Sequence, residues 1–425
     1  MNQMTEINET GFDALVAEMA GSARNAQRQL ARMSDNANTE ALHKASEAIR
    51  QDADIILAAN AQDLEAGQAN GLGTAMLDRL RLDEARLSAI ADAVDSVADL
   101  PCPVGQIIDR ETRPNGMELQ RIRIPVGLIG IIYESRPNVT ADAAALCVRS
   151  GNAALLRGGS EAAHSNRAIH TAFVRGLSAG GIAPEIVQYA PVQDRDFVGA
   201  MLRASGLIDM IVPRGGKSLV ARVQTEARVP VLAHLDGICH SYIHSSADPA
   251  MARDIAVNAK MRRTGICGAM ETLLIDKDFP AASSVVGSLI DTGCELRGDD
   301  RACKVDTRII PANDQDWDTE YLDSILSVAI VDGLDDAMQH IARHSSGHTD
   351  VILAQDNDAV ERFLAQVDSA IVMANASSQF ADGGEFGLGA EIGIATGRLH
   401  ARGPVALEGL TTYKWQVRGS GQTRP

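Results

Sequence analysis

The chain has 425 residues, and at about 150 residues per domain this length predicts two or three domains. Apolar residues make up 45% of the chain but aromatic residues only 3%, so small aliphatic side chains must fill most of the core. The formal charge of −17 at pH 7, from 39 basic and 56 acidic residues, repels phosphate backbones and argues against broad nucleic-acid binding. An anionic substrate would therefore need a local group of Arg or Lys side chains.

The cysteines and the apolar segments indicate a soluble protein of a reducing compartment. Six cysteines without a Cys-x-x-Cys pair are too few for a disulfide framework. The longest apolar run, residues 124–133, includes proline and glycine, and it is far shorter than the roughly 20 residues of a membrane-spanning helix. The polar, acidic start of the chain has no leader pattern. We therefore expect a cytoplasmic protein that binds neither membranes nor nucleic acids.

The first hundred residues predict helices. Asp83 is a suitable N-cap, and apolar residues follow it at helical spacing until Pro101 and Pro103 break the pattern. A β-hairpin is expected next, with strands at 105–111 and 117–124. The Asn-Gly pair between these strands is the strongest short hairpin signal that a sequence offers.

From residue 126 on, short apolar strands alternate with helices, which predicts a parallel sheet covered on both faces. The expected strands of this first set are 126–134, 153–157, 185–190, 207–213 and 230–235. A break near residues 244–249 is the candidate domain boundary. The strands expected in a second alternating set are 271–276, 325–331, 349–354 and 369–374.

Two strand-to-helix turns could bind phosphate, although no Gly-x-Gly-x-x-Gly motif follows a strand. In the first turn, Arg157 could pair with a ribose phosphate, and Ser160 is expected to cap the following helix. Residues 212–217 repeat the same form one unit later. Each turn alone is more often a tight turn than a phosphate site, but two of them on one sheet favour the phosphate interpretation.

Cys267 is a candidate nucleophile. It lies between two glycines, after a basic run and before a strand, and a reactive thiolate needs both positive charge and small neighbours. The alternative is a buried core cysteine, an interpretation that fits Cys147 and Cys239 better. Residue chemistry alone leaves both roles open for Cys267.

The turn at residues 133–140 joins a strand to a helix, where ligands bind in open α/β sheets. Arg136 could contact an anionic group, and the Asn138 amide could donate a hydrogen bond to a developing oxyanion. The alternative is a simple turn and cap, and the local pattern does not decide between them.

We expect no metal site from the histidines. His240 and His244 face one side of a strand beside Cys239, but no convincing third or fourth ligand follows. His340, His344 and His348 recur at helical spacing and are interpreted as a solvated face near a helix end. The glycine-rich segment 382–394 is either a mobile lid, a rigid loop against a ligand, or a surface turn.

Taken together, these segments resemble the glutamate-5-semialdehyde dehydrogenase family, also called γ-glutamyl phosphate reductase, a branch of the aldehyde dehydrogenase superfamily. The matching segments follow in family order from residue 103 onward, and they are 124–140, 151–161, 212–217, 234–237, 258–274 and 381–415. The resemblance implies an aldehyde-dehydrogenase-like α/β fold with two parallel-sheet α/β domains and a small β-hairpin and C-terminal oligomerisation element. It divides the chain into a cofactor-binding domain (1–104 and 125–245), a Cys-bearing catalytic domain (246–395) and an oligomerisation element (105–124 and 396–425).

The resemblance also implies roles for single residues. Cys267 is expected to be the acylated nucleophile, and Asn138 the side-chain donor of the oxyanion hole. Arg157 stands where aldehyde dehydrogenases place a lysine near the adenosine ribose, which agrees with a preference for the 2′-phosphate of NADPH over NADH. Arg136 and Arg263 are expected to offset the charge of the substrate phosphate. The expected cofactor-binding residues are Arg157, Gly158, Gly159, Ser160, Gly215, Gly216, Glu385 and Phe386.

The activity that follows from the resemblance is NADPH-dependent reduction of L-glutamyl 5-phosphate to L-glutamate 5-semialdehyde through a cysteine thioester, the second step of proline biosynthesis from glutamate. Oxidising relatives carry a water-activating Glu that residues 235–240 lack, which argues against a general aldehyde oxidase. Gly268 replaces an Asn that many relatives carry. An acyl-CoA reductase and a non-catalytic nucleotide-binding scaffold are the alternatives. A homo-oligomer is expected, and glutamate 5-kinase is a candidate partner.

Overall fold

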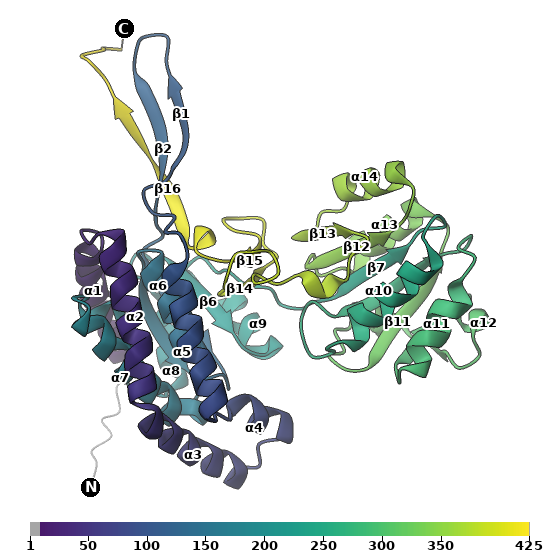
Figure 1. Cartoon of the computed structure of the whole chain (residues 1–425), viewed down its shortest axis with the longest axis horizontal. Coiled ribbons are helices and arrows are strands. Elements are labelled where there is room, and N and C mark those ends of the chain that lie inside the picture. The colour runs from purple at the N-terminus through teal and green to yellow at the C-terminus, as the bar shows by residue number, and fades with distance from the viewer. Residues whose placement is uncertain (1–8, 425) are drawn as a thin grey trace. The chain divides into compact units, whose positions relative to one another are not determined.

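The computed structural model describes residues 9–424, so most of the acidic start on which the leader prediction rests lies outside the described residues. The described chain divides into two compact units (Figure 1). The first contains the residues up to Ala233, Leu388–Gly393 and the residues from Val405 on. The second contains His234–Gly387 and Ile394–Pro404. None of the helices within residues 9–424 is long and apolar enough to cross a membrane.

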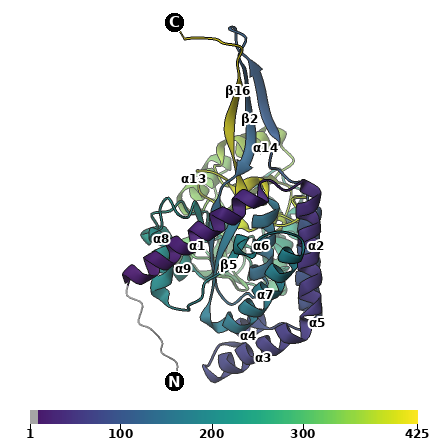
Figure 2. The ribbon, with the colours of Figure 1, turned by 90° about the vertical axis from the view of Figure 1, so that its left-hand side faces the viewer.

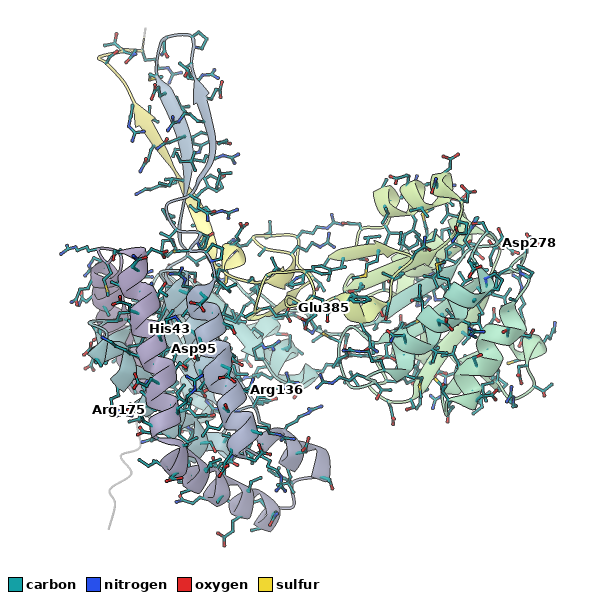
Figure 3. The ribbon with its side chains drawn as sticks, viewed as in Figure 1. His43, Asp95, Arg136, Arg175, Asp278 and Glu385 are labelled. Carbon is teal, nitrogen blue, oxygen red and sulfur yellow. The ribbon has the colours of Figure 1, made fainter. Side chains whose placement is uncertain are left out.

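The first unit begins with the helices that the sequence predicts. They are α1 (Glu9–Leu30), α2 (Asp35–Gln51), α3 (Ala53–Ala69), α4 (Thr74–Leu80) and α5 (Glu84–Asp99). Asp83 caps α5 as predicted, since its carboxylate accepts a hydrogen bond from the Arg86 N–H at 2.8 Å. His43 of α2 and Asp95 of α5, both labelled in Figure 3, are hydrogen-bonded at 2.7 Å.

A four-stranded parallel sheet with the order β5-β4-β3-β6 forms the centre of this unit. Its strands are β3 (Leu128–Tyr133), β4 (Ala153–Gly158), β5 (Val187–Tyr189) and β6 (Met210–Arg214), and its helices are α6 (Val139–Arg149), α7 (Ala163–Ala179), α8 (Arg195–Arg203) and α9 (Lys217–Glu226). Every residue of β3 and β4 is buried, as expected for parallel strands covered on both faces. The prediction of a strand at 230–235 is wrong. Only Val231 forms a bridge to Ile211, because Pro230 has no N–H to donate to a ladder.

The second unit contains a seven-stranded sheet with the order β10-β9-β11-β8-β7-β12-β13, in which all neighbours are parallel. Its strands are β7 (Cys239–Ile243), β8 (Met270–Asp276), β9 (Glu295–Gly298), β10 (Ile310–Pro311), β11 (Ile325–Val331), β12 (Thr349–Leu353) and β13 (Ile371–Ala374). Its helices are α10 (Pro249–Met261), α11 (Ala282–Asp291), α12 (Ala302–Val305), α13 (Leu334–His344) and α14 (Asn357–Gln366). Two separate apolar clusters pack against the sheet, one with α10–α12 and the other with α13 and α14.

The break between the units lies earlier than the expected boundary at 244–249. The second unit begins at His234, because β7 pairs with both β8 and β12 in the middle of its sheet. Residues 396–404, which were expected in the oligomerisation element, also belong to the second unit.

The predicted hairpin is confirmed and gains a third strand from the end of the chain. β1 (Ile107–Thr112), β2 (Glu118–Pro125) and β16 (Thr411–Arg418) form an antiparallel sheet with β2 in the middle. Gly116 adopts a φ of +85° in the turn, a conformation that glycine adopts without strain. Figure 2 shows this sheet extending away from the helices of the first unit. The short strands β14 (Gly393–Ala395) and β15 (Gly403–Val405) pair separately.

We predict that the three-stranded sheet lies in an interface between copies of the chain. Exposed apolar edges are normally covered, and this sheet exposes Ile107, Ile108, Tyr413, Trp415 and Val417. The β2 side and its turn contribute the half-buried Met117, Leu119, Ile122 and Ile124. Sedimentation velocity at micromolar concentration should detect an oligomer, and Ile108→Asp with Trp415→Asp should shift it to smaller species. A monomeric wild type with full activity would contradict this prediction.

Candidate active site

Cys267 lies in the loop between α10 and β8, and it is half-buried. Two neighbouring side chains bind the backbone of this loop and of the end of α10. Gln379 Nε2 donates to the carbonyls of Ala259 at 2.9 Å and Arg263 at 3.3 Å, and Ser378 Oγ donates to that of Gly268 at 2.7 Å. The loop therefore holds its cysteine in place through contacts that do not involve the thiol.

Two further residues, Gly237 just before β7 and Cys239 at its start, complete the support of Cys267. Cys239 is buried, and its thiol donates to the Cys267 carbonyl at 3.1 Å. A Cβ atom at Gly237 would lie 2.3 Å from the same carbonyl oxygen, so only glycine fits there. The prediction that Cys147 and Cys239 are buried is confirmed, and burial raises the pKa of both thiols.

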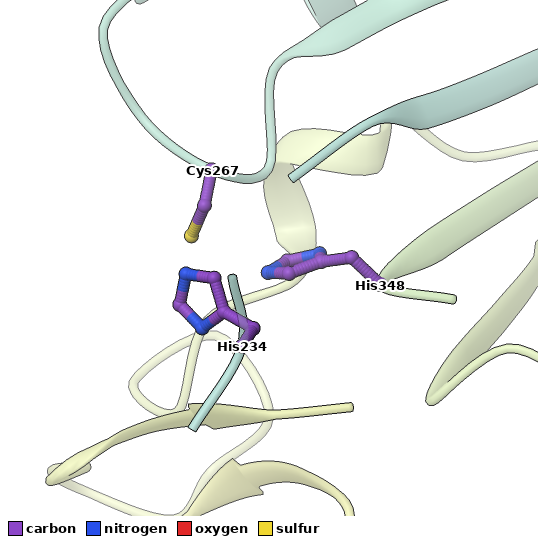
Figure 4. Close-up of side chains that lie close together, drawn as sticks. All are labelled: His234, Cys267 and His348. Atoms are coloured by element: carbon purple, nitrogen blue, oxygen red, sulfur yellow. The ribbon is translucent and has the colours of Figure 1, made fainter. Parts of the chain in front are cut away.

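Two histidines lie beside the Cys267 thiol (Figure 4). One ring nitrogen each from His234 and His348 lies within 4.8 Å of the Cys267 Sγ and of the other. The rings are nearly perpendicular, with centroids 5.2 Å apart. His234 Nδ1 donates to the Ile394 carbonyl at 2.7 Å, so in the neutral ring Nε2 carries the lone pair. An imidazole lone pair next to a thiol can accept its proton.

His348 lies directly before β12 and is fully buried. Its Nδ1 contacts Thr349 Oγ1 at 2.9 Å and Cys239 Sγ at 3.5 Å. Its Nε2 has no hydrogen-bond partner within residues 9–424. Burial lowers the pKa of His348 to about 3, so the ring is neutral near pH 7. In Figure 4 a ring nitrogen of His348 points towards the space between Cys267 and His234.

The interpretation of His348 as part of a solvated helix face is wrong. α13 ends at His344, and Gly347 adopts a φ of +70° that no helix continues. His340 is not solvated either. Its ring packs against those of His240 and Trp317, with centroid distances of 5.6 Å and 5.3 Å.

The basic run before Cys267 contributes less charge than its sequence suggests. Lys260 is fully buried, and its Nζ donates to Glu271 Oε2 at 2.6 Å. This pair joins α10 to β8 and neutralises the ammonium within the core. Arg262 and Arg263 are exposed, so they are the members of the run that remain candidates for phosphate.

The turn after β3 in the first unit carries Arg136 and Asn138. Arg136 is exposed (Figure 3), and the Asn138 amide donates to Asp142 Oδ2 at 2.8 Å. Ser135 adopts an unusual φ of +42°, which Glu161 supports by accepting hydrogen bonds from the Ser135 N–H at 2.6 Å and hydroxyl at 2.8 Å. Contacts within the first unit therefore hold this turn, and the role of Arg136 and Asn138 towards a ligand stays a prediction.

The turn after β4 differs from the expectation at Ser160, which does not cap the long helix. The chain first makes a short 3₁₀ turn, η1 (Ser160–Ala162), and α7 begins at Ala163. Asp63 of α3 caps α7 instead, accepting from the N–H groups of Ser165 at 2.7 Å and His164 at 3.2 Å. Tertiary packing thus satisfies the N–H groups that the sequence assigned to a phosphate.

Arg157, at the end of β4, is buried with 8% of its surface exposed. Its terminal nitrogens donate to the carbonyls of Gly158 at 2.9 Å and Gln193 at 2.8 Å. Its Nε is buried and has no hydrogen-bond partner in the described part of the chain. Burial lowers the pKa of the guanidinium, which nevertheless stays charged.

The glycines of both turns permit close packing. A Cβ at Gly158 would lie 2.1 Å from Asn166, one at Gly159 2.2 Å from Glu161, and one at Gly215 2.5 Å from Glu134. Gly216 is open on this side, precedes α9, and donates its N–H to Glu134 Oε2 at 2.9 Å. Because β4, β3 and β6 are parallel neighbours, their turns lie at one edge of the sheet. The orphaned Arg157 Nε and the uncapped start of α9 fit a phosphate-bearing cofactor at this edge.

Glu385 and Phe386 lie in the glycine-rich segment of the second unit, and both are exposed (Figure 3 labels Glu385). Asp382 forms a turn here by accepting from the Gly384 N–H at 2.8 Å. The role of Glu385 and Phe386 near the nicotinamide ribose stays a prediction.

Comparison with known proteins decides the family. Residues 4–317 match the aldehyde dehydrogenase family. A gamma-glutamyl phosphate reductase of Novosphingobium aromaticivorans is 72% identical over 97% of each chain, and one of Zymomonas mobilis is 61% identical over 99% of each. The chain belongs to the gamma-glutamyl phosphate reductase family. The crystal structure of the gamma-glutamyl phosphate reductase of Thermotoga maritima, 39% identical, matches 96% of this chain and 100% of its own with a TM-score of 0.94.

Membership in this reductase family confirms the predicted fold class and the prediction of an aldehyde dehydrogenase family oxidoreductase of proline biosynthesis. The family also implies a nicotinamide cofactor. His234 and His348 are the residues that sequence reasoning missed. His234 stands in one of the segments that carried the resemblance, but only the strand order β8-β7-β12 brings together the segments before these strands, which carry His234, Cys267 and His348.

Proposed function

We propose that this enzyme reduces L-glutamyl 5-phosphate to L-glutamate 5-semialdehyde and phosphate with NADPH, through a thioester on Cys267. The names of the relatives support the substrate. The observation that carries the mechanism is the half-buried Cys267 thiol in a fixed loop beside His234, whose Nε2 lone pair lies on the side of the sulfur.

The proposed reaction begins when His234 Nε2 accepts the proton of the Cys267 thiol. The thiolate attacks the acyl carbon, the bond to phosphate breaks, and the phosphate leaves with its charge offset by Arg136 or Arg263. When bound, the nicotinamide cofactor supplies a hydride to the resulting thioester. The tetrahedral thiohemiacetal collapses, which re-forms the Cys267 thiolate and releases the aldehyde.

Asn138 keeps the role that the resemblance implies, as the side-chain donor to the oxyanion, with the Cys267 N–H as its partner. In the first unit its amide is oriented by Asp142. The absence of Glu from residues 235–240 supports a thioester that survives until hydride transfer, since the Glu that activates water in oxidising relatives is missing there.

For the cofactor, we assign Arg157 to the ribose 2′-phosphate and the Gly215-Gly216 turn, with the start of α9, to the pyrophosphate. The orphaned Nε of Arg157 and the open Gly216 support these roles. Gly158, Gly159 and Ser160 line the first turn, and Glu385 with Phe386 is assigned to the nicotinamide ribose. We also assign the enzyme to the cytoplasm, as a homo-oligomer, with glutamate 5-kinase as a candidate partner.

Arg157→Ala should weaken the use of NADPH far more than that of NADH. Charged hydrogen bonds contribute roughly 1.5–3 kcal/mol, which corresponds to about a 10- to 150-fold loss of preference for NADPH. The measurement is kcat/KM with both cofactors in wild type and variant, with Arg167→Ala on the exposed face of α7 as the control. If Arg157 only holds its turn through the Gly158 and Gln193 carbonyls, both cofactors will lose equally.

The proposed function is tested by the reverse reaction. The enzyme should reduce NADP⁺ with glutamate 5-semialdehyde only when phosphate is present, because phosphate must cleave the thioester. Replacing phosphate by coenzyme A tests the acyl-CoA reductase alternative. Turnover with coenzyme A but not phosphate, or turnover without either, would overturn the proposal.

A further inference from the structure

The cluster of His234, Cys267 and His348 has the composition of a transition-metal site. It offers one thiol sulfur and two imidazole nitrogens, all within 4.8 Å of one another. Thiolate and imidazole are the ligands that Zn²⁺ prefers, and tetrahedral sites with three protein ligands leave a fourth position for water.

Both histidines are oriented as metal ligands are. His234 uses Nδ1 to donate to the Ile394 carbonyl at 2.7 Å, and His348 uses Nδ1 to contact Thr349 Oγ1 at 2.9 Å. Such contacts from the outer ring nitrogen fix the ring and present Nε2 to the metal. The three ligands lie in segments that precede the neighbouring strands β7, β8 and β12 of one sheet, and their ligand atoms already lie within 4.8 Å of one another, so a site needs little rearrangement.

The unsatisfied Nε2 of His348 is a second observation that points to a bound ligand, and it is independent of the composition of the cluster. His348 is fully buried, and its Nε2 has no hydrogen-bond partner within residues 9–424. An unsatisfied buried polar atom is rare and usually marks an ion, a water or a ligand. This nitrogen is aimed at the cluster (Figure 4), so whatever satisfies it binds between the two histidines and the thiol.

We propose that His234 Nε2, Cys267 Sγ and His348 Nε2 bind a Zn²⁺ ion, with water as the fourth ligand, and that this ion reversibly inhibits the enzyme. On binding, the S–H bond breaks, its proton passes to solvent, and the sulfur lone pair forms the bond to zinc. A sulfur bound to zinc cannot attack the acyl carbon. The inhibition rests on the proposed nucleophilic role of Cys267, whereas the binding does not.

Cobalt provides the test of binding, because Co²⁺ replaces Zn²⁺ and absorbs light. The full-length chain, stripped with EDTA and transferred to chelator-free buffer, is titrated with CoCl₂. We expect a thiolate-to-cobalt charge-transfer band, strong visible bands of a tetrahedral ion, saturation at one equivalent, and loss of all bands on addition of Zn²⁺.

Matched variants identify the ligands. Cys267→Ala should lose the charge-transfer band, whereas Cys303→Ala, a half-buried thiol of the same unit, should keep it. His234→Ala and His348→Ala should each weaken Zn²⁺ binding by at least the roughly 10- to 100-fold that loss of an outer-shell partner causes. His344→Ala, whose ring contacts Asp318, should bind like wild type. Using both histidine variants covers the case in which one fails to fold.

Inhibition is measured as reductase activity against free Zn²⁺, with recovery on addition of EDTA. Absence of the charge-transfer band in wild type, its survival in Cys267→Ala, or unchanged affinity in both histidine variants would overturn the site. Activity in EDTA is a separate readout. An active enzyme that does not bind Co²⁺ refutes only this proposal, whereas an inactive protein that binds Co²⁺ refutes only the proposed function.

Discussion

Cys267→Ala is expected to abolish turnover while leaving NADPH affinity nearly unchanged. Without the sulfur no thioester forms, and removal of a nucleophile from another covalent enzyme costs on the order of 10⁶ in kcat. The substitution should leave the fold intact, because Gln379, Ser378 and Cys239 bind backbone oxygens of the loop and not its thiol. Activity is measured as phosphate-dependent NADP⁺ reduction, and cofactor affinity by NADPH fluorescence.

Cys147→Ala is the matched control, since Cys147 lies buried in α6 and should affect stability alone. Cys239→Ala is a poorer control, because the Cys239 thiol donates to the Cys267 carbonyl and contacts His348. Substantial turnover by Cys267→Ala would refute the thioester mechanism.

His234→Ala should lower kcat by about 10²- to 10⁴-fold, the usual contribution of general acid–base catalysis. The same variant should slow alkylation of Cys267 by iodoacetamide, because alkylation needs the thiolate and not the substrate. Both measurements are made in EDTA, so that a bound metal cannot affect them. A second variant, His234→Asn, retains an amide that can donate to the Ile394 carbonyl but accepts no proton.

Similar losses in His234→Asn and His234→Ala would assign the effect to proton transfer, whereas recovery in His234→Asn would assign it to positioning. His344→Ala serves as the control for loss of a histidine from the same unit. Wild-type rates of alkylation and turnover in His234→Ala would refute the role of this histidine.

Cys267 could be singled out from the sequence as a candidate nucleophile because the glycines and arginines around it are local features, although these features alone left a core role open. The histidines beside it could not, because their approach depends on the order β8-β7-β12, which no local pattern encodes. The spacing of His340, His344 and His348 led to the wrong prediction that His348 lies on a helix, since helical spacing continues in the sequence after the helix ends. The Ser-Ser-Gly segment at 345–347 was the available signal that a turn intervenes.

The turn after β4, which was expected to bind phosphate, was also mispredicted because its decisive contact comes from a residue distant in the sequence. Ser160 follows a strand and has a good capping side chain, so local chemistry assigns it to the helix start. The actual cap, Asp63, lies about a hundred residues earlier on α3, and only tertiary packing brings it to α7. The early boundary of the second unit has a related cause. β7 is a short, partly polar segment, and only its pairing with β8 and β12 assigns it to the second sheet.

The pairing of β2 with β16 means that this sheet is finished only when synthesis of the chain is nearly complete. Thr411 pairs with Pro125, and at 5–20 residues per second a ribosome needs about 15 to 60 s to cover that interval. During this time one edge of β2 has no neighbouring strand, and open edges promote aggregation. Arg123, whose acidic partner Glu408 is made only near the end of the chain, gives the waiting edge positive charge, which discourages pairing with another nascent chain. Arg121 already pairs with Asp109 of β1. Once β16 arrives, Arg121 lies over Tyr413 and Trp415, and Arg123 pairs with Glu408.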